Sequence, residues 1–129
     1  PGGKRRTMSY SYDDQNIFAK ILRGEIPNDT VLETEHSLAF RDIRPQAPNH
    51  VLVIPRGPYV SFDHFAQEAT DAEITDFVRA VGEVCRMEGV EENGFRLISN
   101  AGNHGVQEVP HLHVHILAGR PLGRMLQPA

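Results

Sequence analysis

Cysteine is nearly absent from this chain, which has a single one, Cys85, among its 129 residues. One cysteine excludes an intramolecular disulfide and any zinc finger built from thiolates. No apolar run approaches the ~20 residues that a membrane-spanning helix needs, and no segment resembles a signal peptide. These absences predict a soluble protein of a reducing compartment, the cytoplasm, with no membrane partner.

Positive charge is also scarce. The chain has 13 Lys and Arg against 17 Asp and Glu, a formal net charge of -4, so it lacks the basic surface that nucleic-acid binding requires. Its only basic cluster is Lys4-Arg5-Arg6, close to the N-terminus. We expect residues 1–13 to form a flexible tail, with Met8 as the natural start, and residues 14–129 to form one domain.

The order of predicted elements indicates an α+β fold. The apolar spacing predicts a short amphipathic helix over 16–24 and a longer one that begins at the Thr70–Glu73 capping box and ends at Gly89. Cys85 lies on the apolar stripe of the long helix, so we expect it to pack in the core. Strands are predicted at 30–34, 36–42, 50–55, 94–101 and 111–119. Because helices and strands do not alternate as βαβ units, the five strands are expected to form a largely antiparallel sheet.

Histidine is concentrated in one strand. Of the seven histidines, His111, His113 and His115 occupy alternate positions of "HLHVHILAG". Alternate residues of a strand point to the same face, so the three imidazoles are expected in a row about 6.7 Å apart, with the intervening aliphatic side chains in the core. The remaining histidines outside any motif, His36, His64 and His104, are predicted to lie on the surface.

Three interpretations of this row are possible. Chance histidines on a surface strand are disfavoured by the strict alternation. A zinc site is disfavoured because the outer Cα atoms lie about 13 Å apart, too far for ~2.1 Å bonds to one ion, and only Glu108 or His104 offers a fourth ligand. Catalysis is favoured, because a neutral imidazole is a nucleophile, and a protonated neighbour stabilises an anion or protonates a leaving group.

Three longer segments surround these features: "IFAKILRGEIP" (17–27), "AFRDIRPQAPNHVLVIP" (39–55) and "GVQEVPHLHVHILAGRPLG" (105–123). They resemble the histidine-triad (HIT) proteins in their nucleotide-binding HINT branch, and with the helix between them the resemblance covers roughly residues 14–126. Transferase relatives typically have glutamine in place of His115, and the dinucleoside polyphosphate hydrolase branch lacks this QAP-to-histidine segment. The resemblance implies a HIT-like fold, a homodimer with a continuous sheet, and hydrolysis of purine nucleoside 5'-phosphoramidates, such as adenosine 5'-monophosphoramidate.

The resemblance also implies catalytic roles. His113 would attack phosphorus and form a covalent nucleotidyl-histidine, and His115 would contact the phosphate. His111 and His50 would belong to the supporting proton network. No cofactor is required, because imidazolium and backbone donors would balance the phosphate charge.

The implied nucleotide pocket has a polar and an apolar side. Asp42 would accept the ribose hydroxyls, and Asn100 would hold phosphate oxygens together with the backbone near Val106 and Gln107. Asp42 could equally cap the following turn, and Asn100 could be a turn residue. The apolar wall around base and sugar would consist of Phe18, Ile21, Ile26, Phe40 and Ile43.

Two residues depart from the family pattern. Glu108 stands where many eukaryotic members have serine, and a carboxylate beside a phosphate must point away, be protonated or be paired. Its contribution to phosphate binding is therefore open. Val106 stands where the family often has glycine, so a positive φ at this position is costly.

Two further expectations concern partners. The one-sided stripe from Ile74 to Cys85 is expected to pack on a second copy as well as on its own sheet, and residues 120–129 are expected to reach the neighbouring site. The alternatives to the phosphoramidase are a nucleotide-binding adaptor without a need for turnover, a dinucleoside polyphosphate hydrolase and a zinc-binding protein.

Overall fold

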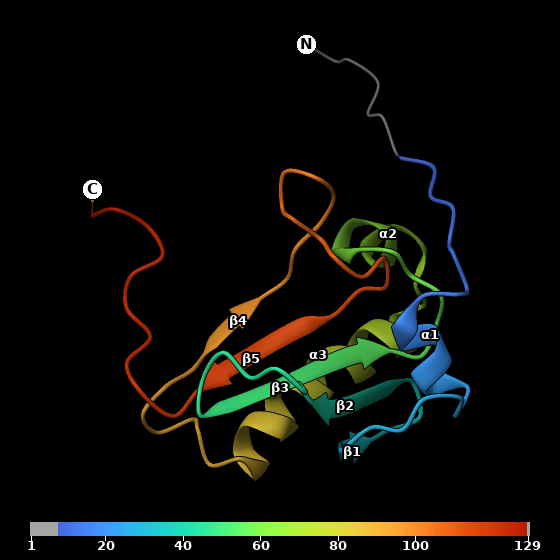
Figure 1. The fold of residues 1–129 in the computed structure, drawn as a ribbon. Helices are drawn as coiled ribbons and strands as arrows, with labels where there is room; N and C mark the ends of the chain where they lie inside the picture. Colours follow the sequence, from blue (N-terminus) through green and yellow to red (C-terminus); the bar gives the residue numbers. More distant parts are fainter. Residues whose placement is uncertain (1–7, 129) are drawn as a thin grey trace.

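The computed structural model describes residues 8–128 and has the predicted α+β architecture (Figure 1). The part of the expected tail over 1–7 lies outside the described residues. In chain order the elements are α1 (Ile17–Leu22), β1 (Thr30–Glu33), β2 (Ser37–Arg41), β3 (Asn49–Pro55), α2 (Phe62–Glu68), α3 (Asp71–Met87), β4 (Arg96–Ile98) and β5 (Val114–Ala118). Across 8–128, no helix combines the length and apolarity that crossing a membrane requires.

The five strands form one sheet in the order β1-β2-β3-β5-β4, and every neighbouring pair is antiparallel. This confirms the predicted sheet. The long helix α3 crosses behind it, while the short helix α1 lies against the opposite face (Figure 1). The two faces of the sheet therefore pack against different helices, and β4 lies at one edge of the sheet.

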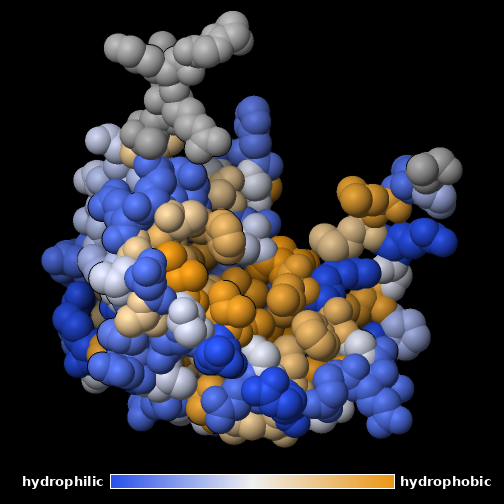
Figure 2. All heavy atoms as spheres, turned by 180° about the vertical axis from the view of Figure 1, so that it is seen from behind, coloured by the Kyte–Doolittle hydropathy of each residue, from blue (hydrophilic) through white to orange (hydrophobic). Residues whose placement is uncertain are grey.

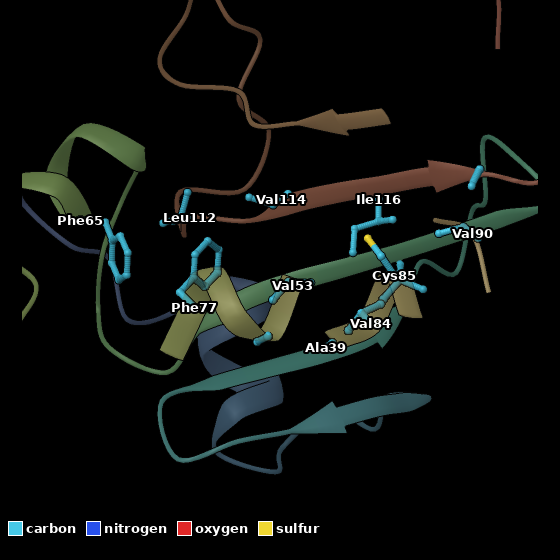
Figure 3. Close-up of a cluster of buried hydrophobic side chains, with 13 residues drawn as sticks. Ala39, Val53, Phe65, Phe77, Val84, Cys85, Val90, Leu112, Val114 and Ile116 are labelled. Atoms are coloured by element: carbon cyan, nitrogen blue, oxygen red, sulfur yellow. The ribbon is translucent and has the colours of Figure 1, made fainter. Parts of the chain in front are cut away.

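The main core lies between the sheet and α3. Val53 of β3 and Ile116 of β5 point toward Phe77 and Cys85 of the helix (Figure 3). Each such side chain contributes ~1.5–3 kcal/mol when it is removed from water, so apolar burial is what holds α3 in place. The predicted packing role of Cys85 is confirmed, since it is 2% exposed and burial raises the pKa of its thiol.

A smaller cluster occupies the other face of the sheet. Phe40 and Leu52 from β2 and β3 pack there with Phe18 of α1. His115 is the cross-strand partner of Leu52, so it lies on this second face. The alternation along β5 therefore separates core side chains from histidines, as the sequence predicts.

The ends of the elements differ from the sequence prediction. Strand β5 begins only at Val114, because the chain before it is held by other contacts: the N–H of Leu112 donates to the carbonyl of Tyr59. The long helix keeps its predicted start, since the Thr70 hydroxyl accepts from the N–H of Glu73 at 3.1 Å and the Glu73 carboxylate accepts from the N–H of Thr70 at 3.0 Å.

Helix α2 was not predicted, and the prediction that His64 lies on the surface is wrong. His64 is 6% exposed because it lies within this helix, beneath the N-terminal segment. Its Nδ1 accepts from the N–H of Val60 at 2.9 Å, and its ring stacks on Tyr10. His104, by contrast, is exposed as predicted.

One polar cluster ties α3 to the outer strands. The Asp76 carboxylate accepts from the hydroxyls of Thr34 and Ser37, both at 2.7 Å. Burial alone would raise the pKa of Asp76, but these hydrogen bonds outweigh it and the pKa is lowered. The ionised carboxylate is therefore favoured by the fold.

We predict that Asp76→Ala lowers the free energy of unfolding by ~1–3 kcal/mol, because it leaves two hydroxyls without their acceptor. Urea denaturation at pH 7 measures the effect, with Glu83→Ala on the exposed side of α3 as the control. Since the pKa of Asp76 is lowered in the folded state, its contribution is present above the unfolded value of about 3.9 and is lost as the pH falls. Equal stability of the two variants at pH 7 would contradict this assignment.

Candidate active site

A pocket of about 750 Å³ opens on the second face of the sheet. It brings together eight of the residues predicted from the sequence: Phe18, Asp42, His50, Asn100, Val106, Glu108, His113 and His115. The sequence analysis missed its other lining residues: Arg44, Gln46, Leu52, Gly105 and Val109. These residues come from segments far apart in the chain, which the sheet places side by side.

His113 presents an unprotonated nitrogen to this pocket. Its Nδ1 lies 2.7 Å from the carbonyl oxygen of His111. A carbonyl only accepts, so Nδ1 carries the hydrogen and donates, which leaves Nε2 with a free lone pair in the neutral ring. Burial lowers the pKa of His113, so the neutral ring prevails at neutral pH.

His111 lies beneath the pocket and does not line it, since it is completely buried. Its Nε2 donates to the carbonyl of Pro55 at 2.8 Å, and its Nδ1 lies 2.6 Å from the hydroxyl of Tyr12. Burial lowers its pKa to about 4. His111 is therefore a neutral ring with both nitrogens engaged, and it supports His113 through its main-chain carbonyl.

His50 and His115 form a second connected pair. The N–H of Gln46 donates to Nδ1 of His50 at 3.0 Å, so the proton of neutral His50 is on Nε2. That nitrogen lies 2.9 Å from Nδ1 of His115 and donates to it. The remaining hydrogen of His115 is consequently on Nε2, so His115 has a donor available next to the acceptor of His113.

The expectation of a protonated flanking histidine is wrong for the protein on its own. Burial, together with His113 and His50, lowers the pKa of His115 to about 4. Burial also lowers the pKa of His50, and the nearby Asp42 carboxylate only partly opposes this shift. All four histidines of the site are therefore neutral near pH 7.

Asp42 makes the turn-capping contact considered from the sequence and also lines the pocket. One carboxylate oxygen accepts from the N–H of Arg44 at 2.8 Å, which is the turn-capping contact. The other oxygen lies 3.5 Å from Nε2 of His50 and faces the pocket. The carboxylate is thus fixed in orientation while one oxygen stays near the histidine pair.

Three neighbouring side chains offer donor atoms that could bind a metal ion. Donor atoms of Asp42, His50 and His115 all lie within 4.8 Å of one another, and a carboxylate with two imidazoles suits zinc. This group is not the row of three histidines, because both ring nitrogens of His111 are occupied by Pro55 and Tyr12. An ion would also have to replace the hydrogen bond between His50 and His115.

The loop before the histidines has an unusual backbone. Among the described residues, Val106 is the only non-glycine residue with a positive φ, at 56°. A β-branched residue in this region is strained by ~1–3 kcal/mol. The sequence analysis noted that a positive φ is costly at this position, and Val106 adopts a positive φ where it lines the pocket.

Two main-chain N–H groups of this loop are already engaged in hydrogen bonds. Those of Val106 and Gln107 donate within the loop to the carbonyls of Asn103 and Gly102. The side-chain amide of Gln107 donates to the carbonyls of Val60 and Val109, at 2.6 and 3.0 Å. The Gln107 side chain therefore holds the loop in place and is not among the described residues that line the pocket.

The apolar wall is smaller than predicted. Phe18 lines it and lies edge-on to His113, with ring centroids 5.0 Å apart. Phe40 is in the core behind Phe18. Ile43 is 89% exposed, and neither it, Ile21 nor Ile26 is among the described residues that line the pocket.

One of the pocket residues that the sequence analysis missed could have been predicted from the sequence pattern. Leu52 follows His50 by two positions in a strand, so the alternation that predicted one face for the histidines also predicts its place beside them. Arg44 and Gln46 lie in the loop "RPQAPN", where no periodicity indicates the direction of a side chain. Only the folded turn reveals that both face the pocket.

The chain is similar in sequence to several known proteins. The chain is 60% identical over 119 residues to an uncharacterised 13.2 kDa HIT-like protein from Azospirillum brasilense, covering 92% of this chain and 98% of that one. It is 43% identical over 113 residues to the purine nucleoside phosphoramidase of Escherichia coli, covering 88% and 94%. It is 42% identical over 111 residues to a 14 kDa zinc-binding protein from Zea mays, covering 85% and 86%.

Solved structures give the same result for the fold. The structure of a histidine triad protein from Clostridium difficile matches with a TM-score of 0.74 and 40% identity, covering 85% of this chain and 95% of that one. The HIT domain family matches residues 23–122, which include the pocket histidines and the whole sheet. The chain therefore belongs to the HIT domain family.

Proposed function

We propose that this protein hydrolyses purine nucleoside 5'-phosphoramidates to the nucleoside monophosphate and an amine. The observation that carries the proposal is the free Nε2 of the buried His113, which lines the pocket together with a hydrogen-bond donor on His115. The 43% identity to the Escherichia coli purine nucleoside phosphoramidase supports the choice of substrate class.

The reaction has two displacements at phosphorus. Nε2 of His113 attacks and forms a phosphorus–nitrogen bond, while the bond between phosphorus and the substrate amine breaks. The amine takes up a proton from water as it leaves, while the Nε2 hydrogen of neutral His115 stays on the ring and donates a hydrogen bond to the reacting group. Water then cleaves the bond to His113, releases the nucleoside monophosphate and gives back the proton that the amine took up.

The remaining pocket residues would bind the nucleotide. Asp42 has an oxygen near the pocket for the ribose hydroxyls, and Asn100 would donate to a phosphate oxygen. Phe18 and Leu52 would contact the flat purine base and the apolar side of the sugar. Glu108 also lines the pocket; as a carboxylate it would favour the positively charged amine over the phosphate.

No metal takes part in this scheme. The neutral His113 is nucleophilic without one, and the hydrogen bond between His50 and His115 engages one nitrogen of each ring. The name of the Zea mays relative makes zinc a separate candidate for the same group of side chains. A nucleotide-binding adaptor remains the alternative in which turnover is irrelevant.

The proposal also includes a homodimer. The side of the sheet that carries α3 shows an apolar area near its centre (Figure 2). Val78 and Leu97 are 65% and 48% exposed and line an apolar groove of about 290 Å³ with Val81 and Ile98. Because β4 is an edge strand beside this groove, a second copy could both cover the apolar surface and extend the sheet.

The nucleophile is tested with a fluorogenic adenosine phosphoramidate. We predict that His113→Ala lowers kcat at least about a thousand-fold, while AMP binding measured by calorimetry persists. His104→Ala, on the exposed part of the neighbouring loop, should retain wild-type turnover. EDTA should leave wild-type turnover unchanged. Full activity of His113→Ala would exclude the mechanism, loss of activity in EDTA would favour zinc, and absence of wild-type turnover would favour the adaptor.

The pH dependence follows from the neutral nucleophile. Since burial lowers the pKa of His113 below its ordinary value of about 6.5, kcat/KM is expected to reach a plateau above neutral pH and to fall on acidification. The midpoint of the decline should lie below pH 6.5. A bell-shaped profile that requires a protonated group near pH 7 would contradict the neutral site.

The dimer is tested by light scattering after gel filtration. We predict a mass twice that of the 14.4 kDa chain for the wild type, and one chain for Leu97→Asp, because an unpaired carboxylate would be buried at the interface. Ile17→Asp, an exposed position on the opposite face, is the control and should remain dimeric. A monomeric wild type would contradict this part of the proposal.

A further inference from the structure

The N-terminal segment 8–16 lies before the region matched by the HIT domain family, which begins at residue 23. It nevertheless contacts the domain at two aromatic side chains. The Tyr10 ring stacks on His64 with centroids 4.7 Å apart, and its hydroxyl donates to the carboxylate of Asp63. Two residues later, the half-buried Tyr12 reaches the histidine site.

Tyr12 completes the hydrogen bonding of His111. His111 is fully buried, and its Nε2 hydrogen is committed to the carbonyl of Pro55. Its other nitrogen, Nδ1, is then an acceptor that needs a donor. The hydroxyl of Tyr12, 2.6 Å away, is the donor that the described residues provide. A phenol at this distance donates to a neutral imidazole, so the contact fixes both the position and the tautomer of the His111 ring.

His111 in turn determines what His113 can do. The carbonyl of His111 accepts the Nδ1 hydrogen of His113, and this bond leaves the pocket-facing Nε2 unprotonated. The ring of His111 that Tyr12 contacts and the carbonyl that His113 contacts are parts of the same residue, which lies shortly before β5 begins. A shift of the His111 ring would therefore move the carbonyl that selects the tautomer of His113.

Among residues 8–128, no other neighbour of His111 donates to its Nδ1. Phe18 lies edge-on to His111 and His113, with centroid distances of 6.4 and 5.0 Å, and has no hydrogen-bonding group. Tyr12 itself is not among the described residues that line the pocket, so it does not bind the nucleotide directly. Its contribution is confined to the support of His111.

We propose that Tyr12 is a positioning residue of the active site, acting through His111 on the tautomer of His113, so that the N-terminal segment is a working part of the enzyme. This inference rests on the proposed phosphoramidase activity for its kinetic consequence. The hydrogen-bonding consequence holds independently of any substrate.

The kinetic experiment compares Tyr12→Phe with Tyr10→Phe. Both remove one hydroxyl from the same segment, but only the first faces a site histidine. Tyr12→Phe is expected to lower kcat about 10- to 100-fold, because the reacting groups are less well oriented, with KM within about twofold of wild type. Tyr10→Phe should keep wild-type kcat. Equal kcat for Tyr12→Phe and wild type, or an equal loss in both variants, would overturn the inference.

A second measurement is independent of turnover. In protein labelled with ¹⁵N at histidine, long-range proton–nitrogen spectra identify which ring nitrogen carries the hydrogen. Wild type should show His111 protonated at Nε2 and His113 at Nδ1, each as one tautomer. In Tyr12→Phe the His111 Nδ1 signal should shift to that of a free acceptor, and His113 should show a second tautomer.

The two measurements separate this inference from the proposed function. If wild type hydrolyses no phosphoramidate, the proposed function fails, and the spectra alone decide the role of Tyr12. An unchanged single tautomer of His113 in Tyr12→Phe would overturn that role. Matching thermal unfolding of the two phenylalanine variants shows that both are folded.

Discussion

Hydrogen bonds from main-chain groups determine the chemistry of the site, since they decide which nitrogen of each buried histidine carries a proton. The carbonyls of His111 and Pro55 accept from His113 and His111, and the N–H of Gln46 donates to His50. Main-chain groups have a fixed donor or acceptor character, so they select one tautomer where a side chain could adapt. The sheet and its adjoining loops hold these groups in place.

Burial of the histidines is the second feature on which the chemistry of the site depends, because it keeps the rings neutral. The same two-residue alternation that packs Val114 and Ile116 against α3 places His113 and His115 on the opposite face, under α1 and the pocket loops. Removal from water lowers the pKa of both histidines, so the rings are neutral at neutral pH. In the proposed mechanism, the neutral acceptor on His113 attacks phosphorus while the neutral ring of His115 donates a hydrogen bond in the same pocket.

The features that could be predicted from the sequence are those that depend on the local pattern of residues. Alternation gave the strand faces, the Thr70–Glu73 box gave the start of α3, and the histidine motif gave the centre of the pocket. It did not predict the role of Gln107 or the burial of His64, because both depend on contacts with distant segments. It also expected imidazolium at the site, since the depth of burial that lowers a pKa is set by the whole fold.

The central claim is that Nε2 of His113 attacks phosphorus. The most direct measurement mixes the protein with a stoichiometric amount of adenosine phosphoramidate, stops the reaction in alkali within the first turnover, and maps the mass increase by peptide sequencing. The account predicts one nucleotidyl group, on His113. A nucleotidyl group on His50 or His115, or turnover in which only water attacks and no adduct forms, would contradict it.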